Sequence, residues 1–258
     1  MSDQSGSQHR QNALISGMTQ QDPPFKVQIV PVTPFQQNCS IIRAASGKAA
    51  VVDPGGEPDK IMAAAEQIDA KIEKIWLTHG HLDHAGAAEE IKRRTGAPIE
   101  GPQKEETFWL DQIAEQWKRF GNEEGEDCKP DRWVEDGDTL ELDGLIFKTV
   151  HTPGHTPGHV VIYNEDARLA FVGDVIFAGS VGRTDFPRGD QATLIRSITE
   201  KLWPLGDDMQ FVPGHGGMST FGRERQSNPF VADTVTGYGG AKKSSPDAVA
   251  QKTSKRWQ

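Results

Sequence analysis

Seven of the eight histidines in this 258-residue chain lie in three short stretches. The first stretch reads Thr-His-Gly-His-Leu-Asp-His from Thr78 to His84 and holds four potential metal ligands within six residues. Alternate positions of an extended segment project to the same side, so His79 and His81 suit one ion. Asp83 and His84 lie further along the turn and suit a neighbouring ion. Imidazole and carboxylate groups match Zn²⁺, Fe²⁺ or Mn²⁺, so we predict a metal site here.

Two further histidine stretches each follow a predicted strand. The second runs from His151 to His159 and contains two Pro-Gly pairs, which predict consecutive turns. Its central residue, His155, is the best candidate ligand, whereas His151 and His159 could coordinate, orient a ligand or be structural. The third stretch, Pro213–Gly216, contains His215 between two glycines that leave room for backbone near an ion.

Two aspartates occupy similar positions at strand ends. Asp174 follows the apolar run Leu169–Val172 through Gly173, and its two carboxylate oxygens could bridge two cations. Asp53 follows Val51 and Val52. We predict that it hydrogen bonds to a ligand imidazole and orients it, with a simple turn-capping role as the alternative.

Alternating strand and helix signals position these residues. The expected strands are Phe25–Val32, Cys39–Arg43, Ala49–Val52, Lys74–Thr78, Leu145–Val150, Val160–Tyr163, Leu169–Val172 and Met209–Val212. The expected helices are Pro58–Asp69, Gly86–Thr95, Lys104–Phe120 and Gln191–Leu202. The aromatic residues of the third helix are expected to be core. Strands and helices mixed in this order predict a mixed α/β fold of two layered halves within one domain.

Composition limits the classes of function. Residues 1–24 and 231–258 are polar and are expected to be flexible tails around one domain at 25–230. The formal charge of −9 argues against nucleic-acid or anionic-membrane partners, which require clustered Lys and Arg. Two cysteines, Cys39 and Cys128, provide no disulfide framework and are expected to be structural or incidental. The chain has no long apolar run and no secretory signal, so we predict a cytoplasmic location.

These motifs resemble the metallo-β-lactamase superfamily and, within it, the short single-domain bacterial form of the glyoxalase II-like hydroxyacylglutathione hydrolases. The resemblance covers roughly residues 25–230. It rests on the motifs Val52–Gly56, Thr78–His84, His151–His159, Gly173-Asp174, Gly182–Phe186 and Pro213–Gly216.

The resemblance implies an αββα sandwich with a binuclear metal centre. One divalent ion would be held by His79, His81 and His155. The second would be held by Asp83, His84 and His215, with Asp174 bridging the two. Zinc is the expected metal, and iron or manganese would tolerate the same ligands. Asp83 would also orient the nucleophile, so it is the expected catalytic residue.

The implied reaction is hydrolysis of S-D-lactoylglutathione or a related small-molecule acyl thioester. Two ions sharing one water lower its pKa toward neutrality and so supply hydroxide. The segment after Phe230 is short, polar and Gly-containing, so we do not expect it to bind glutathione as the C-terminal helical domain of full-length glyoxalase II does. Arg183 and Arg188 are the candidate substrate-binding cations, and solvated loop charges are the alternative.

Three other functions remain open. Gly182–Phe186 also resembles the persulfide dioxygenases, in which one iron would be held by His79, His155 and Asp174. A nuclease of the same fold would require a basic surface, which the acidic composition disfavours. A non-catalytic, metal-stabilised binding protein would bind metal and leave every thioester intact.

Overall fold

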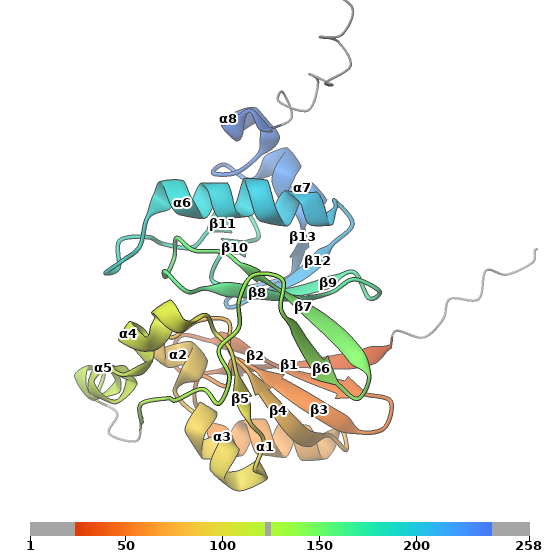
Figure 1. Cartoon of the computed structure of the whole chain (residues 1–258), viewed down its shortest axis with the longest axis vertical. Coiled ribbons are helices and arrows are strands. Elements are labelled where there is room, and N and C mark those ends of the chain that lie inside the picture. Colours follow the sequence, from red (N-terminus) through yellow and green to blue (C-terminus); the bar gives the residue numbers. More distant parts are fainter. Residues whose placement is uncertain (1–23, 122–124, 239–258) are drawn as a thin grey trace, which may run out of the picture.

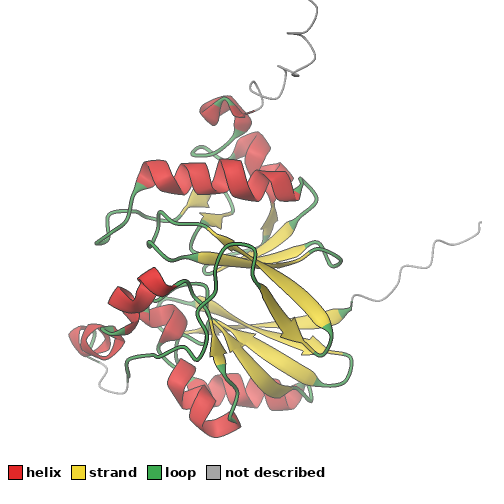
Figure 2. Ribbon diagram, in the orientation of Figure 1, coloured by secondary structure: helices red, strands yellow, loops and turns green. Residues whose placement is uncertain are grey.

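Two β-sheets pack face to face, and helices cover their outer faces (Figure 1). This computed structural model describes residues 24–121 and 125–238. Figure 2 shows the order of the layers: helix, sheet, sheet and helix. The expected αββα sandwich is confirmed. The terminal tails expected at 1–24 and 231–258 lie largely outside the described residues.

The first sheet has the strand order β1-β2-β3-β4-β5. Its strands are β1 Phe25–Val32, β2 Gln37–Ala44, β3 Lys48–Val52, β4 Lys71–Trp76 and β5 Ile99–Glu100. The pairs β1–β2 and β2–β3 are antiparallel, whereas β3–β4 and β4–β5 are parallel. Parallel neighbours need crossover connections, which α1 (Pro58–Gln67) and α3 (Ala88–Thr95) supply on the outer face.

The second sheet has the order β13-β12-β9-β8-β7-β6. Its strands are β6 Thr139–Leu142, β7 Leu145–His151, β8 Val160–Asn164, β9 Leu169–Gly173, β12 Gln210–Pro213 and β13 Ser219–Thr220. Only β9 and β12 pair in parallel among these described strands. A small hairpin of β10 (Ile176–Phe177) and β11 (Ser180–Val181) follows β9. The outer helices are α6 (Gln191–Arg196), α7 (Phe221–Ser227) and α8 (Asp233–Thr236). Helix α6 continues as a π-helical segment over Ser197–Leu202 and a 3₁₀ turn over Trp203–Leu205.

Successive side chains of a strand point to opposite faces of the sheet, and in both sheets the two faces are buried. In β2, Ile41 packs under the outer helices and Ile42 packs between the sheets. In β8, Ile162 packs between the sheets, and Val161 packs toward α6. This two-sided burial explains why the strands are continuous apolar runs in the sequence.

The prediction of one continuous helix over Lys104–Phe120 is wrong. The segment forms a 3₁₀ turn at Lys104–Glu106, then α4 (Thr107–Leu110) and α5 (Ile113–Arg119). The chain leaves the helical path at Gln112, where φ is −129°, and the Asp127 carboxylate accepts the Ala114 N–H at 3.0 Å as the new helix begins. Phe120 is 63% exposed, so the expected aromatic core does not include it.

Other boundaries also differ from the expectation. The helix predicted at Gly86–Thr95 begins at Ala88, because the Ala87 N–H donates to the Pro54 carbonyl at 2.9 Å. A separate turn, α2 (Leu82–Ala85), precedes it. Packing also continues beyond residue 230, because Val231 and Ala232 are buried. Within the described residues, no helix has the length and apolar character needed to cross a membrane.

Candidate metal centre

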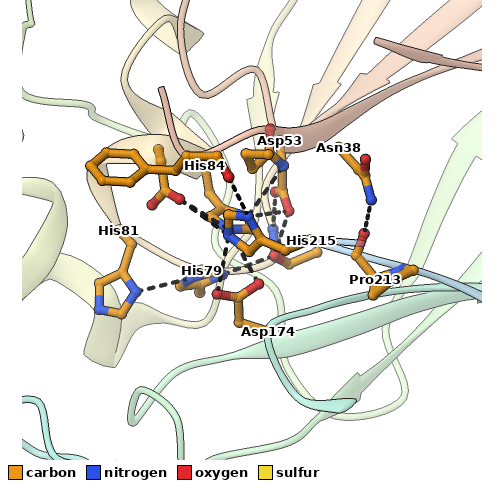
Figure 3. Close-up of polar contacts among 12 residues, drawn as sticks. Asn38, Asp53, His79, His81, His84, Asp174, Pro213 and His215 are labelled. Atoms are coloured by element: carbon orange, nitrogen blue, oxygen red, sulfur yellow. Dashed lines mark hydrogen bonds and ion pairs between the residues drawn. The ribbon is translucent and has the colours of Figure 1, made fainter. Parts of the chain in front are cut away.

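The predicted site residues meet at one end of the space between the two sheets (Figure 3). Each follows a strand that ends there: Asp53 follows β3, the loop with His79 and His81 follows β4, the loop with His155 follows β7, Asp174 follows β9 and His215 follows β12. Strands of both sheets therefore deliver side chains to one place. Asn38 connects β2 to the segment that carries His215. Its side-chain amide donates to the Pro213 carbonyl at 3.0 Å and to the Gly216 carbonyl at 2.9 Å.

Three buried imidazoles form a first donor group. His81 Nδ1 lies 3.1 Å from His79 Nε2 and 3.0 Å from His155 Nε2. All three side chains are at most 7% exposed. Three nitrogen atoms at this spacing can act together as ligands of one ion.

A second donor group lies beside the first and contains Asp83, His84 and His215. Asp83 Oδ2 lies 3.2 Å from His215 Nε2 and 4.0 Å from His84 Nε2. Asp83 and His84 are both on α2, and His215 comes from the loop after β12. One carboxylate oxygen and two imidazole nitrogens can hold a divalent ion.

Asp174 approaches members of both groups, and Figure 3 shows its carboxylate below His84 and His215. Its Oδ1 is 3.4 Å from His84 Nε2, and its Oδ2 is 3.6 Å from His215 Nε2 and 3.7 Å from His155 Nε2. Two glycines make room for this arrangement. A Cβ on Gly214 would collide with Asp174 and His84, and one on Gly173, where φ is +47°, would collide with Thr78 and His159.

Oxygen acceptors fix the orientation of four of the five imidazoles. Their Nδ1 atoms face oxygens at short range: Thr78 Oγ1 for His79 (3.1 Å), Asp53 Oδ2 for His84 (2.9 Å), the Arg183 carbonyl for His155 (2.7 Å) and the Phe35 carbonyl for His215 (3.1 Å). The Thr78 hydroxyl donates to Asp53 Oδ2 at 2.6 Å, so its lone pair remains to accept from His79. Nδ1 therefore carries the proton in each case, which leaves the inward Nε2 free to bind a metal.

Unsatisfied polar atoms support a metal site. His84 Nε2 and Asp174 Oδ1 are buried and have no hydrogen-bond partner among the described residues. Buried polar atoms are normally paired, yet these two atoms face each other at 3.4 Å without forming a hydrogen bond of normal geometry. A divalent ion fits both atoms and the donor chemistry around them. His81 is the exception among the imidazoles, because its inward atom is Nδ1 and its buried Nε2 has no partner in the same residues.

Electrostatics differ between the two groups. Burial lowers the pKa of His79, His81 and His155, so these imidazoles are neutral, as metal binding requires. Burial alone would also lower the pKa of His84, but the charges of Asp174 and Asp83 outweigh burial and raise it. Burial would raise the pKa of Asp174, yet the facing His84 holds it well below its usual range. The metal-free second group therefore holds a proton that an ion must displace.

The two histidines whose roles were open add no ligand atom. His159 Nε2 accepts the backbone N–H of Asp174 at 3.1 Å, and the His159 ring stacks on that of His79 at a centroid distance of 4.6 Å. His151 Nε2 faces the Pro157 carbonyl at 2.8 Å. His159 therefore orients Asp174, and His151 stabilises its own loop.

The two candidate substrate-binding cations lie on aromatic rings. The Arg183 guanidinium forms two hydrogen bonds of 2.7 Å with Asp185 and lies 4.2 Å from the centroid of the Phe186 ring. Arg188 lies 4.2 Å from the centroid of Phe108, and no ion pair to it is found within residues 24–121 and 125–238. Arg183 is thus partly neutralised, whereas Arg188 keeps its charge available.

Aromatic residues connect these cations to the first donor group. The ring centroids of Phe186 and Trp109 lie 4.9 Å and 4.6 Å from that of His81. Trp109 in turn contacts Phe108 at 5.2 Å. Sequence reasoning did not assign this aromatic wall to the site, because the spacing of Phe108 and Trp109 is equally typical of a core helix.

Comparisons with known proteins agree with this geometry. A family model described as the metallo-beta-lactamase superfamily matches residues 32–215. Hydroxyacylglutathione hydrolase GloC of Haemophilus influenzae is 47% identical over 208 residues, which are 80% of this chain and 98% of that protein. The crystal structure of BLEG-1 B3 metallo-beta-lactamase is 31% identical with a TM-score of 0.74, over 80% of this chain and 99% of that chain.

A further crystal structure, of TTHA1623 in a di-iron-bound form, is 32% identical with a TM-score of 0.72, over 79% of this chain and 100% of that chain. The family model spans most of the described residues. The chain therefore belongs to the metallo-β-lactamase superfamily and is a metal-dependent hydrolase.

Proposed function

We propose that this member of the superfamily holds two divalent ions and hydrolyses acyl thioesters of glutathione, of the S-D-lactoylglutathione type, to a hydroxy acid and a thiol. The observation that carries the proposal is the pair of donor groups joined by Asp174. His79, His81 and His155 would hold one ion. Asp83, His84 and His215 would hold the other, and Asp174 would be shared between them.

The protein's part in the reaction is to position groups. When bound, two neighbouring divalent ions lower the pKa of a shared water and polarise a carbonyl oxygen. Asp83 has a second carboxylate oxygen besides the one near His215, and this oxygen would accept a hydrogen bond from the attacking water and orient it. Asp53 and the Phe35 carbonyl hold His84 and His215 with Nε2 directed inward. Neither Cys39 nor Cys128 takes part, because both are buried outside the centre.

Two relatives support the details of the proposal. The Haemophilus influenzae protein is named for the hydrolysis of hydroxyacylglutathione and is matched over nearly its whole length. TTHA1623 binds two irons, which supports two ions here. Zinc is the metal that we propose, and the donor set of imidazoles and carboxylates also suits iron or manganese.

Arg188 and Arg183 provide the proposed contacts with glutathione. Arg188 is exposed and stacks on Phe108, so its charge is available to a substrate carboxylate. Arg183 pairs with Asp185 on the surface, where ion pairs are weak and a substrate carboxylate can compete. The two cations flank the aromatic wall beside His81, and a glutathione moiety bound there would direct its thioester toward the centre.

The second donor group is what favours a hydrolase over a persulfide dioxygenase. A dioxygenase of the kind considered above needs one iron on His79, His155 and Asp174 and leaves the remaining donors without a role. In this chain Asp83, His84 and His215 are together, and Asp53 orients His84. A mononuclear function gives no reason for that orientation.

The proposal is tested by following the thioester absorbance of S-D-lactoylglutathione with purified, metal-loaded protein. We expect loss of absorbance that stops after chelation, a severe loss of rate in His84→Ala and a rate close to that of the wild type in the matched control His151→Ala. A parallel oxygen electrode with glutathione persulfide should register no uptake. Full activity in His84→Ala, or oxygen uptake without thioester hydrolysis, would overturn the proposal.

A further inference from the structure

Glu106 is a fully buried carboxylate next to the metal centre and belongs to none of its donor groups. It lies at the end of the 3₁₀ turn before α4 and is 0% exposed. One oxygen accepts the backbone N–H of Gly80 at 2.8 Å, and the other accepts that of Gly158 at 2.7 Å. No Lys or Arg pairs with it among the described residues. The two backbone amides, together with the Thr156 side chain, therefore offset part of the cost of burying this carboxyl group.

The two amides belong to the two loops that carry the first donor group. Gly80 lies between His79 and His81, in the loop after β4 of the first sheet. Gly158 lies between His155 and His159, in the loop between β7 and β8 of the second sheet. A single side chain thus connects loops from different sheets. His155 Nε2 meets His81 Nδ1 across the same gap at 3.0 Å.

The contact is closely packed on both sides. A Cβ on Gly80 would crowd the Glu106 carboxylate and the Trp109 side chain, and a Cβ on Gly158 would collide with the Glu106 backbone and side chain. The Gln103 N–H also donates to the Gly158 carbonyl at 3.1 Å. The segment before α4 therefore forms two hydrogen bonds with Gly158, one through Gln103 and one through Glu106. The spacing between the loops therefore depends on the length of the Glu106 side chain and on its two acceptor atoms.

Burying a carboxylate has a cost that packing alone does not require. Burial raises the pKa of Glu106 to about 7, and the Thr156 side chain and the N–H groups of Gly80 and Gly158 oppose that rise. Apolar groups fill buried space at lower cost, so the two acceptor oxygens explain a carboxyl group here better than packing does. Glu224 is an equally buried carboxyl group away from the centre and so serves as a control. It is 1% exposed and hydrogen bonds to Gly179, Ser219 and Asn228, none of which is in either donor group.

We propose that Glu106 is a positioning residue that sets the distance between the His79–His81 loop and the His155 loop, and so raises the affinity of the first donor group for its ion. This inference rests on the metal centre of the proposed function. The inference predicts that Glu106 affects the affinity for one of the two ions. A residue with only a general structural role would affect the affinity for both.

Two substitutions separate charge, length and acceptor number. Glu106→Gln keeps the size but replaces one acceptor with an NH₂ group, which would face a backbone N–H. Glu106→Asp keeps both acceptors and the charge but shortens the reach by one methylene. Glu224→Gln makes the same change at an equally buried carboxylate away from the centre, and Glu105→Gln makes it at the exposed neighbour.

The experiment measures metal affinity by competition with a chelator, using Zn²⁺ as the probe, in two backgrounds that each leave one donor group intact. In His215→Ala, Glu106→Gln should weaken the remaining ion by about 10- to 100-fold, and Glu106→Asp should weaken it less. In His81→Ala, Glu106→Gln should leave the affinity of the remaining ion unchanged. Glu224→Gln should lower the unfolding temperature without changing either affinity.

Unchanged affinity in the His215→Ala background would overturn the inference. So would equal weakening in both backgrounds, because that result would make Glu106 a general stabilising residue. Glu106→Asp provides the same comparison if Glu106→Gln fails to fold. The wild-type arm tests the underlying centre separately: if the wild type binds fewer than two ions, the proposed function fails, and this inference fails with it.

Discussion

Replacing Asp53 with Asn changes which nitrogen of His84 carries the proton. In the native site, Asp53 Oδ1 accepts the Thr78 N–H at 2.7 Å, and Oδ2 accepts from the Thr78 hydroxyl and His84 Nδ1. The asparagine carbonyl must stay at the Oδ1 position, because a backbone N–H can only donate. Its NH₂ group then faces His84 Nδ1, which becomes an acceptor. In the neutral ring the single proton then favours Nε2, the atom that we assign as a metal ligand.

The size of the effect follows from the bond that is lost. To bind a metal, the His84 ring of the variant must return its proton to Nδ1, where it would face the NH₂ group. A hydrogen bond to a charged acceptor contributes about 1.5–3 kcal/mol, and the metal-bound variant lacks this bond. At about 1.4 kcal/mol per tenfold change, the second ion should bind roughly 10- to 150-fold more weakly.

The assay compares metal affinity with stability. Asp53→Asn keeps the acceptor for the Thr78 N–H and removes a buried charge, so we expect the free energy of unfolding of the metal-free protein to change by no more than about 1–2 kcal/mol. Zn²⁺ binding by chelator competition should show one weakened ion, and thioester hydrolysis should fall in parallel. Asp69→Asn is the matched control, because Asp69 has the same positive φ of 52° and is exposed.

Wild-type affinity for both ions in Asp53→Asn would refute this reasoning, since the proton on His84 would then not depend on Asp53. Equal loss of affinity in Asp69→Asn would refute it as well, because the cause would then lie in the backbone conformation.

Three further expectations follow from the site. Because Asp174 and Asp83 raise the pKa of His84, the metal-free centre is protonated below that pKa; metal affinity should fall as the pH falls, and calorimetry in different buffers should detect proton release. Arg188→Ala should raise KM for a glutathione thioester by about two- to fivefold with little change in kcat, and high salt should abolish the difference. Burial raises the pKa of Cys39 and Cys128, so neither thiol should react with a disulfide reagent until the protein unfolds; rapid reaction of the native protein would contradict this burial.

Much of the fold can be predicted because the strands are buried on both faces. Val51, Val52, Val161 and Ile162 give short apolar runs, and each predicted run from residue 25 to 52 lies within an observed strand. The break in the helix after Leu110 was not predicted, because the Asp127 carboxylate that accepts the Ala114 N–H at the start of α5 lies outside the predicted helix. Short strands such as β13 also gave no periodic signal, since they contain only two residues.

The candidate ligands could be identified from residue type and spacing, because imidazoles and carboxylates at strand ends are rare without a function. The atoms that orient them could not. His155 and His215 face the carbonyls of Arg183 and Phe35, and every residue has a carbonyl, so no side chain marks these partners. Glu106 was missed for a related reason: it stands in the charged run Lys-Glu-Glu, which is typical of a solvated surface.

Titrating the metal-free protein with Zn²⁺ while following hydrolysis of S-D-lactoylglutathione tests the binuclear centre most directly. The two donor groups joined by Asp174 predict that activity depends on both sites and reaches its full value only after two equivalents have bound. Full activity after one equivalent would contradict the binuclear account. Absence of hydrolysis with two ions bound would contradict the thioester as substrate.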